Sequence, residues 1–235
     1  MVDNAFKQIR EEAYAGNMEL PKNNLVIVTF GNVSSADHGR GVFAIKPSGV
    51  PYEQLSPEKM VIVDFDGNIV EGDLRPSSDT PTHAVLYKHW EDVGGIVHTH
   101  STYGTAWAQA IMDIPIFGTT HADHTTLNIP CAPPMDDEMI KGQYEYETGF
   151  QIMNALKDRG ITHQDVEMIL VGSHAPFTWG KNAAKAVYNS VVLEEIAKMA
   201  MFTLQIHPNN PLLKPALIEK HYQRKHGANA YYGQK

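Results

Sequence analysis

Cysteine is almost absent from this chain of 235 residues, which contains only Cys131. One thiol cannot form a disulfide within the chain, and the reducing cytoplasm is the compartment that we expect. No run of about 18 apolar residues occurs, so we expect no membrane span, and residues 1–18 lack the apolar core of a signal peptide. Lysine and arginine together number 19 against 27 aspartates and glutamates. The resulting charge of -8 makes nucleic acid a poor partner.

Two common catalytic motifs are also missing. The sequence has no HExxH, which excludes the usual metalloprotease pattern, and no GxxxxGK[ST], which excludes a Walker loop. Hydrophobic residues make up 43% of the chain and charged residues 20%, as is usual for globular proteins. The length is sufficient for one domain with a real hydrophobic core.

Apolar runs and turn signals divide the chain into interleaved strands and helices. Strands are expected at 25–30, 41–46, 60–65, 68–70, 95–100 and 168–171. Helices are expected at 3–18, ending before Pro21, from Pro81 to Trp90, and at 103–110, 145–159 and 183–204. The Asp66-Gly67 pair indicates a hairpin between two of these strands. This mixture predicts a single layered α/β domain over residues 1–235.

Two histidines, His98 and His100, end the strand that is expected from Gly95. Residues two apart on a strand point to the same face, so the two imidazoles can bind one metal ion. The alternative is a pair of ordinary histidines, but an apolar strand would then bury two polar rings side by side at a cost in free energy. The position therefore favours a metal site.

A third ligand must come from elsewhere in the chain. His174 is the best candidate because it follows the apolar run 168–171, again at the end of an expected strand. His121 and His124, in a segment expected to be a loop, compete for the same role. Three histidines with an open coordination position are typical of catalytic zinc sites, and Mn²⁺ or Co²⁺ could use the same ligands.

Polar segments that can bind an anion recur earlier in the chain. They are Asn32 in a glycine turn, Lys46-Pro47-Ser48-Gly49, and Ser77-Ser78 where a helix is expected to begin. Free N–H groups at a helix N-terminus attract phosphate. Each segment alone is better explained by turn chemistry, but together they predict a phosphate pocket. Asp79 is either a cap of that helix or a further metal ligand.

Together these residues resemble the L-ribulose-5-phosphate 4-epimerase family of the class II aldolase and adducin superfamily. The resemblance runs from about Leu20 to Gln234. It rests on Asn32, Lys46-Pro47-Ser48-Gly49, Ser77-Ser78-Asp79-Thr80, His98-Thr99-His100, Gly118-Thr119-Thr120-His121-Ala122-Asp123, His174, Lys225-His226-Gly227 and Tyr231-Tyr232-Gly233-Gln234. It implies a three-layer α/β/α fold around a central, largely antiparallel sheet. It also implies a cyclic homotetramer with metal sites at its subunit interfaces.

The resemblance further assigns roles to single residues. One divalent ion per subunit, most often zinc, is implied at His98, His100 and His174, with Asp79 as a further ligand. The substrate phosphate is implied to lie among Asn32, Lys46, Ser48, Gly49, Ser77 and Ser78. Asp123 matches an acid/base carboxylate. Tyr232 matches a catalytic tyrosine that reaches in from the neighbouring subunit. Each site is then expected to combine Asp123 of its own subunit with Tyr232 of the neighbour. His221 and Arg224 match further substrate-binding residues of the tail, which would otherwise be interpreted as a frayed terminus.

Two positions depart from the family pattern. Gly172 stands where relatives often carry a histidine or a bulkier residue, and His124 stands where an aromatic is common. The implied activity is the interconversion of L-ribulose 5-phosphate and D-xylulose 5-phosphate, which leaves the pentose route open between arabinose, ascorbate and others. Because C4 bears no acidic proton, its inversion requires cleavage and re-formation of the C3–C4 bond, helped by a metal and by the proton transfers of Asp123 and Tyr232.

Two rival functions are considered. One is a class II aldolase that releases its fragments, but the resemblance implies that those enzymes carry a glutamate where this chain has Asp79. The other is a non-catalytic interaction domain like the adducin head, which the complete set of His98, His100 and His174 disfavours.

Overall fold

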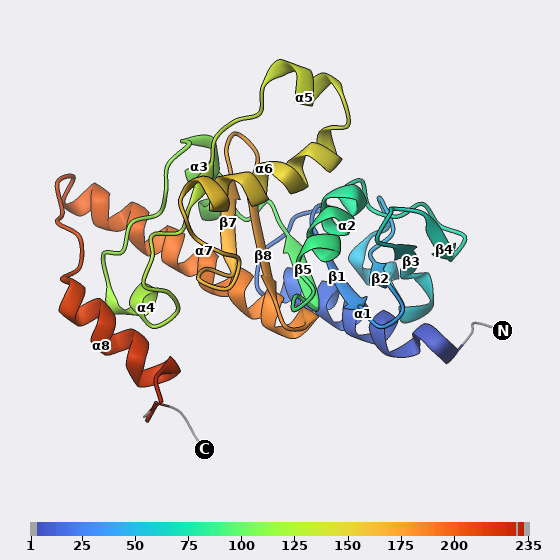
Figure 1. The fold of residues 1–235 in the computed structure, drawn as a ribbon, viewed down its shortest axis with the longest axis horizontal. Coiled ribbons are helices and arrows are strands. Elements are labelled where there is room, and N and C mark those ends of the chain that lie inside the picture. Colours follow the sequence, from blue (N-terminus) through green and yellow to red (C-terminus); the bar gives the residue numbers. More distant parts are fainter. Residues whose placement is uncertain (1–3, 229, 233–235) are drawn as a thin grey trace.

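An eight-stranded sheet forms the centre of the protein, in the order β4-β3-β2-β1-β5-β8-β7-β6 (Figure 1). The computed structural model describes residues 4–228 and 230–232, so Asp3 of the expected first helix and Gly233 and Gln234 of the tail lie outside the described residues. The strands are β1 Asn32–Asp37, β2 Val42–Ile45, β3 Val61–Asp64, β4 Ile69–Glu71, β5 Gly95–His98, β6 Cys131–Ala132, β7 Met168–Val171 and β8 Pro176–Gly180. Neighbouring strands are antiparallel, except that β6 runs parallel to β7.

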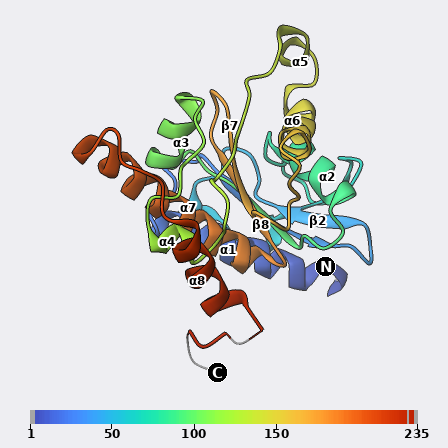
Figure 2. The ribbon, with the colours of Figure 1, turned by 60° about the vertical axis from the view of Figure 1, so that its left-hand side comes forward.

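Helices cover both faces of this sheet. The α-helices are α1 Lys7–Lys22, α2 Thr80–His89, α3 Thr102–Gln109, α4 Thr119–Ala122, α5 Asp137–Lys141, α6 Tyr144–Asp158, α7 Ala183–Ile206 and α8 Pro215–His226. Short 3-10 helices are η1 Asn4–Phe6, η2 Tyr52–Gln54 and η3 Pro57–Lys59. Figure 2 shows α2 and α6 on one side of the sheet and α1 with α7 on the other. The expected α/β/α layering with a largely antiparallel sheet is therefore confirmed.

The alternation of side chains in β2 explains why both faces are covered. Val42 and Ala44 belong to the core formed with α1 and α7, whereas Phe43 and Ile45 belong to the core formed with α2 and α6. Successive side chains of a strand point to opposite faces, so a strand that is apolar throughout requires cover on both. Among residues 4–228 and 230–232, no helix combines the length and the apolar character that crossing a membrane requires.

The strand expected at 25–30 is wrong. Ile27 and Val28 are exposed, Val28 has a φ of 55°, and the Phe30 N–H bonds to the Ile27 carbonyl at 3.1 Å, which closes a turn. The strand begins later, at Asn32. The apolar composition of 25–30 indicated a strand, but no strand of the described chain is paired with this segment.

Three further features differ from expectation. α1 does not end before Pro21 but includes it in its last turn, where the proline removes only its own N–H and the Asn23 N–H still reaches the Glu19 carbonyl at 3.1 Å. His121 lies in α4 rather than in a loop. The tail is helical as α8, which packs on α4 although none of its residues is buried.

The Asn17 side chain joins α1 to the sheet, because it bonds to the backbone N–H and carbonyl of Val33 as a neighbouring strand would. Its Oδ1 accepts the Val33 N–H at 3.0 Å, and its Nδ2 donates to the carbonyls of Val33 and Ala13, both at 2.8 Å. Asn17 is fully buried. We expect Asn17→Leu to lower the free energy of unfolding by roughly 2–4 kcal/mol, because two buried backbone groups of Val33 lose their partner.

Urea unfolding measures this loss. Asn23→Leu is the matched control, because the Asn23 side chain makes one exposed bond to the Glu19 carbonyl and its loss should change stability by less than about 1 kcal/mol. Equal losses in the two variants would contradict the role assigned to Asn17.

Candidate active site

Three neighbouring strands place polar and aromatic groups in one row at the sheet centre. His98, the last residue of β5, lies directly opposite Asn32 of β1 on one side and Phe177 of β8 on the other. Directly opposite residues of antiparallel strands share a face, and here it is the face under α2. The Phe177 ring stacks on the His98 imidazole with centroids 4.2 Å apart and an interplanar angle of 19°.

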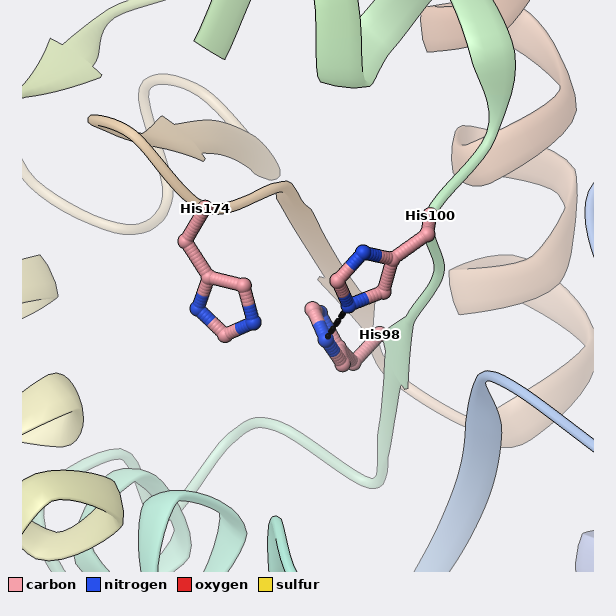
Figure 3. A group of neighbouring side chains, drawn as sticks. All are labelled: His98, His100 and His174. Atoms are coloured by element: carbon pink, nitrogen blue, oxygen red, sulfur yellow. Dashed lines mark hydrogen bonds between the residues drawn. The ribbon is translucent and has the colours of Figure 1, made fainter. Parts of the chain in front are cut away.

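His98, His100 and His174 form a three-histidine group (Figure 3). One nitrogen from each ring lies within 4.8 Å of the others, and Figure 3 shows the three rings turned toward one another. His174 lies in the turn between β7 and β8, where Ser173 adopts a φ of 62°. The glycine at 172 allows that turn, because an added Cβ would lie 2.5 Å from the Ala132 carbonyl oxygen.

The chemistry of the three-histidine group fits a divalent metal. The Nδ1 of His98 donates to the Pro176 carbonyl at 3.0 Å, so its Nε2 is left with a free lone pair. The Nε2 atoms of His98 and His100 lie 3.2 Å apart, and two nitrogens on one tetrahedral zinc lie about 3.3 Å apart. Burial lowers the pKa of His100, and burial with the nearby His98 and His100 lowers that of His174 to about 3. Neutral imidazoles are the form that a metal requires.

The expected phosphate segments pair with each other through the backbone. The Ser77 N–H bonds to the Lys46 carbonyl at 3.0 Å, and the Ser48 N–H bonds to the Arg75 carbonyl at 2.9 Å. Gly49 has a φ of 68°, which suits glycine in this turn. Two segments about thirty residues apart are thereby held side by side next to the three-histidine group.

One cavity of ≈ 380 Å³ unites these residues. Every residue predicted to bind metal or phosphate, apart from those of the tail, lines it: Asn32, Lys46, Ser48, Gly49, Ser77, Ser78, Asp79, His98, His100 and His174. The cavity also has walls that the sequence did not indicate, Phe30 of the segment 25–30 and Tyr144 with Glu145 at the start of α6. Tyr144 and Glu145 carry no local signal, because only the packing of α6 brings them to the histidines.

Lys46 is a buried cation without an acidic partner. It is 2% exposed, and its Nζ contacts the Thr29 carbonyl at 3.2 Å and lies 5.0 Å above the Tyr52 ring. No carboxylate among the described residues pairs with it, and burial lowers its pKa. A buried charge of this kind is costly unless a counter-charge arrives, so this wall of the cavity is suited to an anion.

Asp79 is at the N-cap of α2 but does not cap it. Its side chain makes no bond to the helix backbone; instead Oδ2 accepts from Asn32 Nδ2 at 2.6 Å and from Ser77 Oγ at 3.4 Å. Burial raises its pKa, but His98, His83 and the Asn32 bond lower it by more, so the group is held as a carboxylate. The interpretation of Asp79 as a helix cap is therefore wrong.

The predicted catalytic and tail residues form a second group. We call Asp123 with its partners His221, Arg224 and Lys225 the Asp123 cluster, and Tyr232 lies beside it. Asp123 Oδ1 accepts from His221 Nδ1 at 2.9 Å and from Arg224 Nε at 3.0 Å, and Oδ2 accepts from Arg224 Nη2 at 2.7 Å. The Tyr232 ring lies 4.8 Å from both the Arg224 guanidinium and Lys225 Nζ. Burial raises the pKa of Asp123, but the bonds from Arg224 and His221 and the charge of Lys225 lower it by more. None of these residues lines the 380 Å³ cavity of the same chain.

The competing histidines lie away from the three-histidine group. His121 bonds through Nε2 to the Leu127 carbonyl at 3.0 Å, and the His124 ring packs beside Tyr188 at 5.6 Å. Among the described residues, the one cluster of possible metal ligands contains His174 and neither of these two. His174 is therefore the third member of the group, as the sequence favoured.

Comparison with known proteins supports this picture of the fold. Residues 11–201 match the family model described as the class II aldolase and adducin N-terminal domain. An L-fuculose 1-phosphate aldolase superposes with a TM-score of 0.75 at 21% identity, over 92% of this chain and 95% of that one. YgbL of Escherichia coli, described only as an aldolase, epimerase or decarboxylase, superposes with a TM-score of 0.71 at 24% identity, over 91% of this chain and 97% of that one. An aldolase II superfamily protein of Pseudomonas syringae superposes with a TM-score of 0.76 at 14% identity, over 95% of this chain and 86% of that one. At these identities the solved structures show a shared fold alone.

Metal content tests the three-histidine group. We expect His174→Asn to lose most of the bound metal while remaining folded, because two of the three imidazoles cannot hold the ion as tightly. Metal would be measured by atomic emission after chelator treatment and reloading with Zn²⁺. His124→Asn is the control and should retain wild-type content. Full metal in His174→Asn together with loss in His124→Asn would overturn this ligand set.

Proposed function

Because the chain belongs to the class II aldolase and adducin family, we propose that it is a metal-dependent L-ribulose-5-phosphate 4-epimerase. The observation that carries the proposal is the meeting of the three-histidine group and the buried, unpaired Lys46 in one cavity. A metal site beside an anion site is what a sugar phosphate with a carbonyl group requires. Members of the family that are class II aldolases depend on a divalent metal, and the identity of the ion here belongs to the proposal, with Zn²⁺ as our expectation.

The residues of the cavity supply binding and orientation. Lys46, with Ser48, Gly49 and the Ser77-Ser78 segment, would hold the phosphate and keep the two-carbon fragment in place after cleavage. A divalent cation at the three-histidine group would polarise the C2 carbonyl as a Lewis acid. The unpaired Lys46 gains its counter-charge only when phosphate is present, which favours phosphorylated over free sugars.

The reaction requires two proton transfers at C4. A base removes the C4 hydroxyl proton, the C3–C4 electron pair stays with the three-carbon fragment, and C4 becomes the aldehyde of glycolaldehyde phosphate. The aldehyde turns over, the bond re-forms on its other face, and an acid protonates the new hydroxyl. Asp123 is held unprotonated by Arg224 and His221, so it enters this sequence as a proton acceptor, and Tyr232 is the partner that we propose.

Asp79 supports an epimerase rather than an aldolase. The family resemblance implies a glutamate at this position in aldolases, and here the shorter carboxylate is drawn toward Asn32 and Ser77. A carboxylate that is already hydrogen-bonded and one methylene shorter is less able to reach substrate atoms beyond the histidines. We therefore do not expect fragment release to be the main outcome.

A substrate assay distinguishes these functions. With L-ribulose 5-phosphate as the sole substrate, we expect D-xylulose 5-phosphate to form, as detected by a coupled assay, and the activity to disappear after chelation and return with Zn²⁺ or Mn²⁺. Accumulation of dihydroxyacetone and glycolaldehyde phosphate would indicate the aldolase instead. A metal-loaded protein that gives neither product would contradict the proposal and favour an interaction domain.

We also propose that the Asp123 cluster and Tyr232 complete the cavity of a neighbouring subunit. Their absence from the cavity of their own chain supports this, and so does Arg224, which bonds to Asp123 and lies under the Tyr232 ring. This coupling differs from the sequence expectation, which left Asp123 in its own subunit. Asp123 and Tyr232 would then come from the same neighbour in a cyclic homo-oligomer, with a tetramer as our expectation.

Mixed oligomers test the shared site. His98→Asn and Asp123→Asn should each be nearly inactive alone, the second because loss of proton transfer costs about 10²–10⁴-fold. If Asp123 acts on the neighbour, equal co-expression should restore about a quarter of wild-type activity, because a random ring with one repeating interface pairs an intact metal site with an intact donor at roughly one site in four.

A second mixture separates the two donors. Asp123→Asn co-expressed with Tyr232→Phe should give no recovery if both groups come from one subunit, and about a quarter if they come from different subunits. Mass measurement with two affinity tags confirms that mixed oligomers form. Inactive mixed rings of His98→Asn with Asp123→Asn would return Asp123 to the site of its own subunit.

A further inference from the structure

A chain of polar side chains is buried directly behind the metal site. The Tyr87 hydroxyl lies 2.7 Å from Ser34 Oγ, and Ser34 Oγ lies 2.7 Å from His83 Nδ1. All three side chains are fully buried. His83 and Tyr87 are one turn apart on α2 and so share a face, while Ser34 comes from β1. None of these three residues lines the cavity described above.

The directions of these hydrogen bonds follow from which groups carry a hydrogen that they can donate. Burial raises the pKa of Tyr87, so its hydroxyl keeps its proton, and Ser34 Oγ is the side-chain partner that it has among the described residues. Buried polar groups in folded proteins usually have a hydrogen-bond partner, so we assign the Tyr87 hydroxyl as a donor to Ser34. The hydrogen of the Ser34 hydroxyl then has His83 Nδ1 as its side-chain acceptor among the described residues. His83 Nδ1 is therefore an acceptor, and the hydrogen of the neutral ring is on Nε2.

That Nε2–H is left without a partner. It is buried and bonds to no described residue, and an unpaired buried donor costs about 1–3 kcal/mol. His83 follows Asp79 by one helical turn, its backbone N–H bonding to the Asp79 carbonyl at 3.1 Å. Its ring also packs against Phe177, on which His98 stacks. The His83 ring is therefore next to the Phe177 ring that supports His98, and one helical turn from Asp79.

Asp79 has the matching unused acceptor. Its Oδ2 takes the bonds from Asn32 and Ser77, whereas its Oδ1 accepts no hydrogen bond from a described residue. Carboxylates beside metals are usually held by a further hydrogen bond that fixes their orientation. An orphaned donor and an unused acceptor one turn apart on the same helix suggest that the two meet when the site is loaded.

We propose that His83 is a positioning residue for Asp79: its Nε2–H donates to the Asp79 carboxylate, directly or through one water, when a divalent metal occupies the three-histidine group. Tyr87 and Ser34 hold His83 in the tautomer that can donate. This inference rests on the metal site of the proposed function and is independent of the substrate. It assigns a role in metal affinity to residues that never touch the metal.

Two substitutions at position 83 separate the nitrogens. The amide of His83→Gln retains an N–H near the Nε2 position. The amide of His83→Asn is one methylene shorter and extends only to the Nδ1 position. We expect His83→Asn to bind Co²⁺ about 10- to 100-fold more weakly, the usual range for loss of such a supporting group, and His83→Gln to remain within a few-fold of wild type. Co²⁺ is titrated into chelator-treated protein and followed by its visible absorption.

A double-mutant cycle with Asp79→Asn shows whether His83 acts through Asp79. If it does, His83→Asn should cost little further affinity when Asp79 is already an amide. An equal loss in both backgrounds would mean general damage to α2 and would overturn the proposal, as would wild-type affinity in His83→Asn. Ser34→Ala is the second variant, should His83→Asn fail to fold. It leaves His83 in place and should weaken Co²⁺ binding by removing the donor to Nδ1, so unchanged affinity there would also count against the proposal.

These outcomes are distinguishable from failure of the proposed function. A wild-type protein that binds Co²⁺ but does not epimerise L-ribulose 5-phosphate overturns the function and leaves the role of His83 open to the same titration. A wild-type protein that binds no Co²⁺ overturns both.

Discussion

The register of β1, β5 and β8 is the constraint on which the site depends. It sets Asn32, His98 and Phe177 in one row on the face under α2. A slip of one residue would turn the His98 side chain to the opposite, apolar face. Gly95 helps to fix the register at the other end of β5, because a Cβ there would lie 2.4 Å from the backbone nitrogen of Ala183. The start of α7 is therefore packed against the start of β5, and the metal site lies at the far end of the same strand.

The polar groups in and behind the site lower the stability of the folded protein. Lys46 is buried without a carboxylate, and the Nε2 of His83 and the Oδ1 of Asn32 are buried without a hydrogen-bond partner. Unsatisfied polar groups are rare in folded proteins and concentrate at functional sites. Asn32 and Lys46 line the cavity, and His83 packs against Phe177, on which His98 stacks. Ligands that pair these groups would recover part of that free energy by binding only the folded state.

The sequence was informative where a signal is local and weaker where packing decides. His98 and His100 were paired from an expected strand at 95–100; the structure brings the two rings together, but β5 ends at His98 and His100 follows it outside the strand. Asp66-Gly67 marked a hairpin that the structure contains. The run 25–30 had strand composition, yet a strand needs a partner, and the chain instead turns at Val28, just before Thr29 and Phe30, which line the cavity. Tyr144, Glu145 and His83 could not be found, because only the tertiary packing of α6 and α2 gives them their positions. The helix α8 was overlooked for a related reason, since none of its residues is buried in the single chain.

The lack of buried residues in α8 suggests what stabilises this helix. Isolated helices of about twelve residues are marginal in water. The helix α8 packs on α4 and is tied to Asp123 by His221, Arg224 and Lys225. Leu217 of the helix and, beyond its end, Tyr231 and Tyr232 remain uncovered. A helix of this kind is best stabilised by a second surface that covers its apolar side. If a neighbouring subunit provides that surface, the contact that orders α8 is the same contact that brings Asp123 and Tyr232 to a cavity, and assembly and completion of the site become one event.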